Sequence, residues 1–237
     1  MTPLPIAATF GRVTKAESVA NGMMGGSDEP WVATAPEGAA VLDVLSGQER
    51  GAEVGRRAVV LAGPTAVGKG TVVAEVRQRH PEVWLSISMT TRPPRPGEID
   101  GVHYWFVTSE QFIAARDAGE LLEWAQVHGQ HFYGTPRQPV VEHLAAGVPT
   151  LLEIDLAGVR QVRETMPEAL FVFLAPPSFA ALQERLIGRA TETAAEQARR
   201  LETARVELAA ENEFDVVVVN DTVAAAADQL STLLGIG

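Results

Sequence analysis

One stretch decides the fold of this chain: Val59-Val60-Leu61-Ala62-Gly63-Pro64-Thr65-Ala66-Val67-Gly68-Lys69-Gly70-Thr71. An apolar run over 58–62 stops at Gly63, and a helix-compatible segment follows Gly68, so the pattern predicts strand, turn and helix. The glycine spacing is that of a phosphate-binding loop, whose backbone N–H groups and lysine hold a nucleotide's phosphates. The strict pattern has Ser or Thr directly after the lysine, whereas here Gly70 precedes Thr71. An ordinary strand-to-helix turn is the alternative, but a helix opening at Gly68-Lys69 favours a phosphate site.

The composition bounds the class of protein. The chain has 237 residues, of which 46% are hydrophobic, and it has no cysteine. This length accommodates one α/β domain of about 180 residues plus an appendage. Disulfides and thiolate metal sites are excluded, and the net charge of −11 argues against a general nucleic-acid binder. Without a long apolar run or a secretory signal pattern, we expect a cytoplasmic protein with no membrane or nucleic-acid partner.

Residues 1–55 differ from the rest of the chain. They carry scattered Gly, Pro and Ala and show no sustained period of two or 3.6 residues. We interpret them as a flexible, disordered N-terminal tail, with a short docked helix as the alternative. The globular part is predicted to span 56–237.

From Arg56 onward, predicted strands and helices alternate. Near-continuous apolar runs predict strands over 58–62, 84–89, 149–154, 169–174 and 214–219. Helices are predicted over 69–79, 136–146, 158–165, 178–186, 196–210 and 223–234, and another begins at the capping box Thr108-Ser109-Glu110-Gln111. Five such strands separated by helices predict an α/β fold with a parallel, doubly wound sheet. Residues 90–146 interrupt this rhythm with short mixed elements, such as 104–107 and 121–127, as an inserted substrate lobe does.

A second concentration of chemistry follows the second predicted strand. It reads Ser86-Ile87-Ser88-Met89-Thr90-Thr91-Arg92-Pro93-Pro94-Arg95-Pro96-Gly97-Glu98. Ligands of open α/β sheets bind at the carboxyl ends of strands. Two arginines three residues apart, stiffened by prolines, present planar forks that suit bidentate phosphate capture. A proline-rich surface turn with incidental arginines is the alternative, and the neighbouring phosphate-binding loop favours the phosphate site.

Further motifs follow in order along the chain. They are Gly101-Val102-His103-Tyr104, Leu122-Glu123-Trp124-Ala125, Tyr133-Gly134-Thr135, Leu152-Glu153-Ile154-Asp155, Phe173-Leu174-Ala175-Pro176-Pro177-Ser178, Arg185-Leu186-Ile187-Gly188-Arg189 and Val219-Asn220-Asp221. Together with the loop and the 86–98 run, they resemble guanylate kinase over about residues 56 to 235. The resemblance implies a P-loop three-layer fold with a core of 56–89 and 147–237. It also implies an inserted GMP-binding lobe over about 90–146 and a helical lid over about 185–200.

The resemblance implies an activity as well. Guanylate kinase transfers the γ-phosphoryl group of MgATP to GMP, and we expect to dGMP, giving GDP and ADP in purine nucleotide metabolism. The acceptor oxygen is already anionic, so catalysis rests on positioning and charge neutralisation, with no general base. The implied catalytic set is therefore cationic: Lys69, Arg92, Arg189 and Arg200.

The implied binding residues form three groups. ATP would be held by the loop and by a residue near the adenine: Gly63, Pro64, Thr65, Ala66, Val67, Gly68, Lys69, Gly70, Thr71 and Asn220. GMP would be held by Ser88, Arg92, Arg95, Glu98, Tyr104, Glu123, Tyr133, Thr135 and Glu153. Glu123 would read guanine N1–H and the exocyclic amine, and Thr135 would donate to O6. Mg²⁺ would lie near Thr71 and Asp155, in part through water.

Several alternatives stay open at these positions. Glu123 is a solvated residue in the alternative interpretation, as are Arg189 and Arg200 in their charged helical segments. Glu153 and Asp155 are alternatively part of a loop cap. The sequence also departs from the family at Ala190, where glycine is usual, and in a turn at 129–133 that is one residue longer than the commonest form.

Two other functions compete with a guanylate kinase, which we expect to be a monomer or a small homo-oligomer. One is a related P-loop kinase with another phosphate acceptor. Glu123, Thr135 and Tyr104 argue against it. The other is a non-catalytic guanylate-kinase-like interaction module. Lys69, Arg189 and Arg200 argue against this one.

Overall fold

The computed structural model describes residues 57–127, 129–187 and 194–236. The predicted tail over 1–55 lies outside the described residues, as do Arg189 and Ala190 of the predicted lid. Within the described ranges, no helix combines the length and the apolarity that crossing a bilayer requires.

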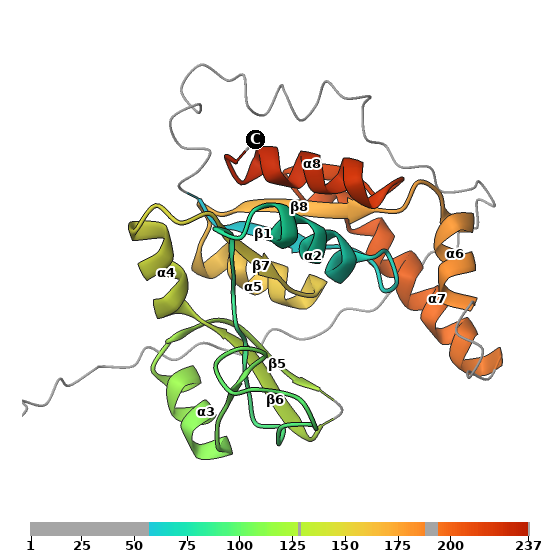
Figure 1. The fold of residues 1–237 in the computed structure, drawn as a ribbon. Helices are drawn as coiled ribbons and strands as arrows, with labels where there is room; N and C mark the ends of the chain where they lie inside the picture. The colour runs from blue at the N-terminus through green and yellow to red at the C-terminus, as the bar shows by residue number, and fades with distance from the viewer. Residues whose placement is uncertain (1–56, 128, 188–193, 237) are drawn as a thin grey trace, which may run out of the picture. The chain divides into compact units, whose positions relative to one another are not determined.

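A five-stranded parallel sheet forms the centre of the fold (Figure 1). Its strands, in spatial order, are β2 (Trp84–Leu85), β7 (Thr150–Glu153), β1 (Val59–Ala62), β8 (Leu170–Ala175) and β9 (Val216–Val219). Each neighbouring pair is parallel, and in the middle Val60 lies opposite both Leu152 and Phe171. The predicted parallel sheet is confirmed.

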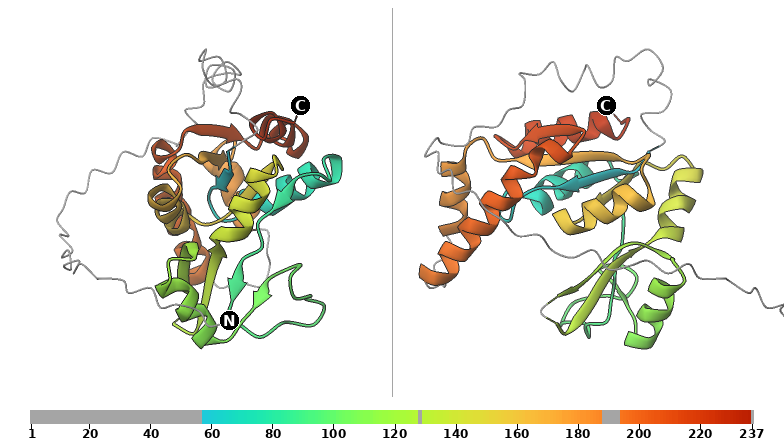
Figure 2. Two further views of the ribbon diagram at one scale, coloured as in Figure 1. Left: turned by 90° about the vertical axis from the view of Figure 1, so that its left-hand side faces the viewer. Right: turned by 180° about the vertical axis from the view of Figure 1, so that it is seen from behind.

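Helices cover both faces of this sheet because every residue of β1 is apolar and buried, so the side chains on both faces need apolar partners. Leu61 packs in one core cluster with Val72 and Leu230, which lie on α2 (Lys69–Arg79) and α8 (Val223–Leu233). Val60 packs in a second cluster with residues of α4 (Arg137–Ala145) and α5 (Leu156–Thr165). Figures 1 and 2 show α8 and α5 on opposite faces of the sheet. The doubly wound arrangement follows from this period of two.

The remaining helical elements complete one side of the core. They are α6 (Phe179–Ile187), α7 (Ala194–Ala209) and the short 3₁₀ helix η1 (Glu211–Glu213). Leu182 of α6 and Leu208 of α7 are buried in the same cluster as Leu61. This packing fixes the carboxyl-terminal part of α7 against the central sheet.

A second, mixed sheet lies in the region between β2 and α4. Its order is β4 (Trp105–Phe106), β3 (Met89–Thr90), β6 (His131–Pro136) and β5 (Leu121–Val127). α3 (Ser109–Asp117) packs on it through Phe112, and the predicted capping box is confirmed. Gln111 N donates to Thr108 Oγ1 at 3.2 Å, and Thr108 N donates to Gln111 Oε1 at 2.9 Å. A small sheet therefore interrupts the alternating fold, as the sequence predicts.

The strand predicted over 84–89 is divided between the two sheets. Trp84–Leu85 pairs with β7, whereas Met89–Thr90 pairs with β4 and β6. Between them Ser86 N bonds Leu151 O of the central sheet, and Ser88 O accepts from Trp105 N of the second sheet. Both ends of this segment carry apolar residues that are partly buried, but the two ends pair with different sheets. This run connects the two sheets.

Candidate active site

Glycines determine the shape of the loop between β1 and α2. Gly63 has φ 152°, and a Cβ there would lie 2.3 Å from Leu174 O. Gly68 has φ 100°, and a Cβ there would lie 2.8 Å from Asn220 Nδ2. A side chain at Gly63 or Gly68 would clash with Leu174 O or with the Asn220 side chain. The conformation of the loop therefore requires glycine at both positions.

Two side chains hold this loop from behind. Asn220 Nδ2 donates to Val67 O at 2.8 Å, and Arg185 Nη1 donates to the same oxygen at 3.0 Å. Arg185 Nη2 also donates to Asn220 O at 3.3 Å. Asn220 is only 3% exposed. The resemblance implies a place for it beside the adenine, and the structure adds a direct hydrogen bond from its side chain to the loop. Arg185 belongs to one of the motifs that resemble guanylate kinase, but the resemblance implies no role for it.

Lys69 folds back on the loop that precedes it. Its Nζ donates to Gly63 O at 2.7 Å and to Pro64 O at 3.4 Å. Burial lowers the pKa of Lys69, against the attraction of the Glu153, Glu207 and Asp155 carboxylates, which raises it. Lys69 therefore lies in a negatively charged environment. A polyphosphate bound near Lys69 would also lie close to these three carboxylates.

Glu207 is a site residue that sequence reasoning missed. Its Oε2 accepts from Thr65 N of the loop at 2.8 Å. Glu207 lies on α7, seven residues after Arg200, so the two occupy the same face of the helix. Nothing local distinguishes this glutamate from the charged residues around it in α7, because its partner lies 142 residues away.

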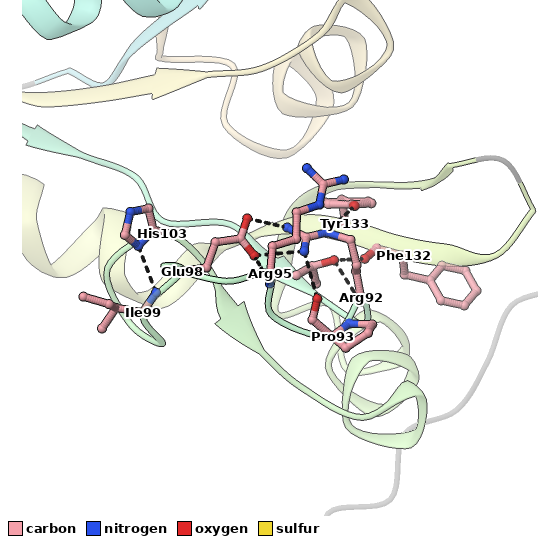
Figure 3. A network of polar contacts seen from close by, with 9 residues as sticks. Arg92, Pro93, Arg95, Glu98, Ile99, His103, Phe132 and Tyr133 are labelled. Carbon is pink, nitrogen blue, oxygen red and sulfur yellow. Dashed lines mark hydrogen bonds and ion pairs between the residues drawn. The ribbon is translucent and has the colours of Figure 1, made fainter.

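Arg92 is the centre of a polar cluster in the second sheet (Figure 3). Its Nη1 and Nη2 donate to Glu98 Oε2 and Oε1, both at 2.9 Å, and its Nε donates to Tyr133 Oη at 3.1 Å. These bonds from Arg92, followed by one from Arg95 N at 2.7 Å, lower the pKa of Glu98 to about 2. The same pairing raises the pKa of Arg92 above its usual range. The guanidinium is thus charged and fixed in direction.

Aromatic rings complete this cluster. The Tyr104 ring centroid lies 5.4 Å from Arg92 Cζ and meets the Tyr133 ring edge-on at 6.0 Å. Ser88 directly precedes β3, and Arg95 lies on the exposed loop that follows the strand. The structure therefore brings four of the predicted residues into direct contact: Arg92, Glu98, Tyr104 and Tyr133.

Glu123 and Thr135 form a buried pair between β5 and β6. The two residues are directly opposite in register, and Thr135 Oγ1 donates to Glu123 Oε1 at 2.6 Å. Glu123 is 9% exposed and Thr135 is fully buried, so Glu123 is not a solvated surface residue. Burial raises the pKa of Glu123 to about 7, aided by the negative charge of Asp155 and opposed by the Thr135 bond.

The two clusters share one face of the second sheet. Tyr133, bonded to Arg92, and Thr135, bonded to Glu123, are two residues apart on β6. Side chains at positions i and i+2 of a strand point to the same side, about 7 Å apart. The Glu123–Thr135 pair and the Arg92 guanidinium therefore lie side by side. This arrangement suits a ligand that carries both a polar base and a phosphate.

Two carboxylates lie at the carboxyl end of β7, Glu153 as its last residue and Asp155 two residues later. Asp155 caps α5, because its Oδ1 accepts from Gly158 N at 2.7 Å. Burial raises the pKa of Glu153, against the attraction of Lys69. A Cβ at Gly70 would lie 4.0 Å from Glu153 Oε1. Thr71 lies exposed in the first turn of α2.

The side-chain oxygens of Glu153, Asp155 and Thr71 suit only a metal ion that takes most of its ligands from water and substrate. In the part of the chain that the structure describes, no group of three or more His, Cys, Asp and Glu is placed to hold an ion. Mg²⁺ typically takes one or two carboxylates and completes its shell with water and substrate phosphates. The donor set near Lys69 fits an ion that arrives with a nucleotide.

Comparison with known proteins places the chain in a family. The model of the guanylate kinase family matches residues 55–235. A guanylate kinase of Bifidobacterium longum is 62% identical over 182 residues, covering 75% of this chain and 93% of that protein. One of Frankia casuarinae is 62% identical over 175 residues, covering 74% and 95%. A crystal structure of guanylate kinase from Anaplasma phagocytophilum, 32% identical, covers 76% of this chain and 84% of that one with a TM-score of 0.58. The chain therefore belongs to the guanylate kinase family.

Proposed function

We propose that this protein transfers the γ-phosphoryl group of ATP to GMP, giving ADP and GDP. The observation that carries the proposal is the buried Glu123–Thr135 pair beside the fixed Arg92 on one face of the second sheet. Membership of the guanylate kinase family, whose curated relatives bear that enzyme's name, supports it. The loop at 63–71 supplies the nucleotide side of the reaction.

Base recognition is assigned to Glu123 and Thr135. Guanine presents N1–H and an exocyclic amine on one edge, with O6 beside them. The Glu123 carboxylate accepts from the first two, and the Thr135 hydroxyl, which now donates to Glu123, turns to O6. Adenine lacks this set of donors and would leave a buried carboxylate unpaired, at a cost of about 1–3 kcal/mol or more.

Phosphate recognition is assigned to the Arg92 cluster. Glu98 and Tyr133 hold the guanidinium of Arg92 in place, so it keeps its direction when the GMP phosphate arrives. Arg95, Tyr104 and Ser88 complete the phosphate site. Since the acceptor oxygen is already anionic, these residues orient it and no general base is required.

Lys69, Arg189 and Arg200 are assigned to the transferred phosphoryl group. Lys69 leaves the carbonyl oxygens of Gly63 and Pro64 to reach the phosphates of ATP. When bound with ATP, Mg²⁺ supplies positive charge that offsets the phosphates and the carboxylates around Lys69. Asp155 and Thr71 are the residues that would hold it, in part through water. Cytoplasmic location and a monomer or small homo-oligomer belong to this proposal.

A coupled ADP-release assay with a panel of acceptors tests the function. We expect strong turnover with GMP, turnover with dGMP, and little with AMP or UMP. Turnover of AMP without GMP would contradict the proposal and favour a kinase with another acceptor. GMP binding with no turnover of any acceptor would favour an interaction module.

A further inference from the structure

Helix α5 contacts strand β5 at three successive positions around Glu123. Gly158, Gln161 and Thr165 are spaced by three and four residues, so they lie along one face of α5. α5 packs on the central sheet, whereas β5 belongs to the second sheet. This face of α5 is where the core touches the strand that carries the predicted base-reading carboxylate.

Gln161 makes the most specific of these contacts. Its Nε2 donates to Trp124 O at 2.9 Å, and its Oε1 accepts from Trp124 N at 3.1 Å. One carboxamide thus satisfies both backbone groups of the residue that follows Glu123. β5 is an edge strand of the second sheet, so Gln161 stands where a neighbouring strand would pair.

The strand needs this support because its pairing with β6 is irregular just before Glu123. The register between β5 and β6 shifts between Leu121 and Glu123, so the β6 ladder alone does not fix the backbone there. Thr165 Oγ1 donates to Leu122 O at 2.7 Å on the other side of Glu123. The residues before and after the carboxylate are both bonded to α5.

Gly158 completes the arrangement beneath the carboxylate itself. A Cβ at Gly158 would lie 3.2 Å from Glu123 Oε2, so α5 approaches the Glu123 side chain closely. The Glu123 carboxylate is therefore bounded by Thr135 on β6 and by the first turn of α5. Its position depends on where α5 holds the β5 backbone.

We propose that Gln161 is a positioning residue for base selection, acting on Glu123 through the backbone of Trp124. The inference rests on the proposed function, in which Glu123 reads the guanine edge. A carboxylate that must meet two donors of one base tolerates displacements of only about 0.5 Å. Loss of the Gln161 bonds frees the edge strand at Trp124, directly after its irregular register, so Glu123 loses its fixed distance from the base.

Kinetics of Gln161→Ala with two acceptors test the proposal. We expect the KM for GMP to rise about tenfold, the effect of about one hydrogen bond, with the KM for ATP unchanged. IMP lacks the exocyclic amine, so it depends less on Glu123, and the preference for GMP over IMP falls. The matched control is Gln138→Ala, which removes one exposed bond from Gln138 to Glu142 on α4. We expect the control to leave both KM values unchanged.

Gln161→Glu separates positioning from mere stability. The carboxylate keeps the length of the side chain and accepts from Trp124 N, but it has no proton to donate to Trp124 O at neutral pH. We expect the same loss of GMP preference as in Gln161→Ala, with circular dichroism showing a folded protein. Equal rises in the KM for ATP and GMP, or an unchanged preference for GMP over IMP, would overturn the inference. Failure of the unaltered protein to phosphorylate GMP would instead overturn the proposed function.

Discussion

The two proposed phosphate sites of this protein are built in different ways. The loop at 63–71 is a backbone site, shaped by Gly63 and Gly68, and its lysine is bonded only to neutral carbonyl oxygens of the loop among the described residues. The Arg92 cluster is a side-chain site, in which an ion pair with Glu98 fixes the cation. A bond to a neutral carbonyl is easier to exchange than a two-point ion pair. We infer that the Lys69 side chain changes position when its ligand binds, whereas Arg92 is already held in its binding position.

Replacing the mobile cation has the largest expected effect. Lys69→Ala removes the charge that reaches the phosphates, and we expect kcat to fall about 10²–10³-fold, or roughly 3–4 kcal/mol of transition-state stabilisation. Steady-state rates with GMP and ATP measure it. Arg77→Ala, an exposed site on the same helix, is the matched control and should retain activity. Comparable rates in Lys69→Ala would remove the loop from the catalytic site.

Replacing the fixed cation has a smaller effect that falls on binding. Arg92→Lys keeps the charge but loses the two-point bond to Glu98 and the bond to Tyr133. We expect the KM for GMP to rise about 30-fold, or roughly 2 kcal/mol, with the KM for ATP unchanged. Arg79→Lys, which alters a two-point surface pair with Glu75 on α2, is the control. A loss of kcat with an unchanged KM would show that Arg92 is not held in advance.

This contrast also explains which features the sequence could predict. The loop is local: a strand, two glycines and a lysine within 13 residues define it, and α2 begins at Lys69 as predicted. The central strands β1, β7 and β8 are predictable because they are buried and nearly continuously apolar. In the side-chain site, Arg92 and Arg95 are predictable from the local sequence, whereas Tyr133, which lies 41 residues from Arg92, was predicted only from a family resemblance.

What the sequence could not predict depends on distant contacts. Glu207 resembles any glutamate of a charged helix, and only the fold brings it to Thr65 N. Arg185 and Gln161 are polar residues on amphipathic helices, and their partners are backbone atoms, which carry no sequence signal. The division of 84–89 between two sheets was missed for the same reason, because an apolar run does not specify its partner.

The buried carboxylate should make the side-chain site sensitive to pH. With a Glu123 pKa of about 7, the ionised form needed to accept from guanine is lost as the pH falls below 7. We expect the KM for GMP to rise up to tenfold per pH unit below 7, with less change in the KM for ATP. Glu123→Gln should remove this dependence and weaken GMP binding at pH 8. Glu120→Gln, an exposed residue just before β5, is the control.

The same group links pH to folding stability. Because the pKa of Glu123 is raised in the folded protein, the folded state holds a proton that the unfolded chain releases above about 4.5. The resulting stabilisation is complete below pH 4.5 and is lost as the pH rises through 7, for a total of roughly 3 kcal/mol. In thermal melting without ligand, the stability of Glu123→Gln relative to the unaltered protein should therefore increase between pH 5 and pH 8. A constant difference would contradict the raised pKa.

The support behind the backbone site gives the smallest effect. Asn220→Ala removes the bond to Val67 O, but Arg185 still donates to that oxygen at 3.0 Å, so the loop keeps part of its support. We expect the KM for ATP to rise about fivefold, the effect of about 1 kcal/mol, with the KM for GMP unchanged. Asn212→Ala, at an exposed position in η1, is the matched control. A rise in the KM for GMP as well would show that the two phosphate sites are coupled through the core and do not respond separately.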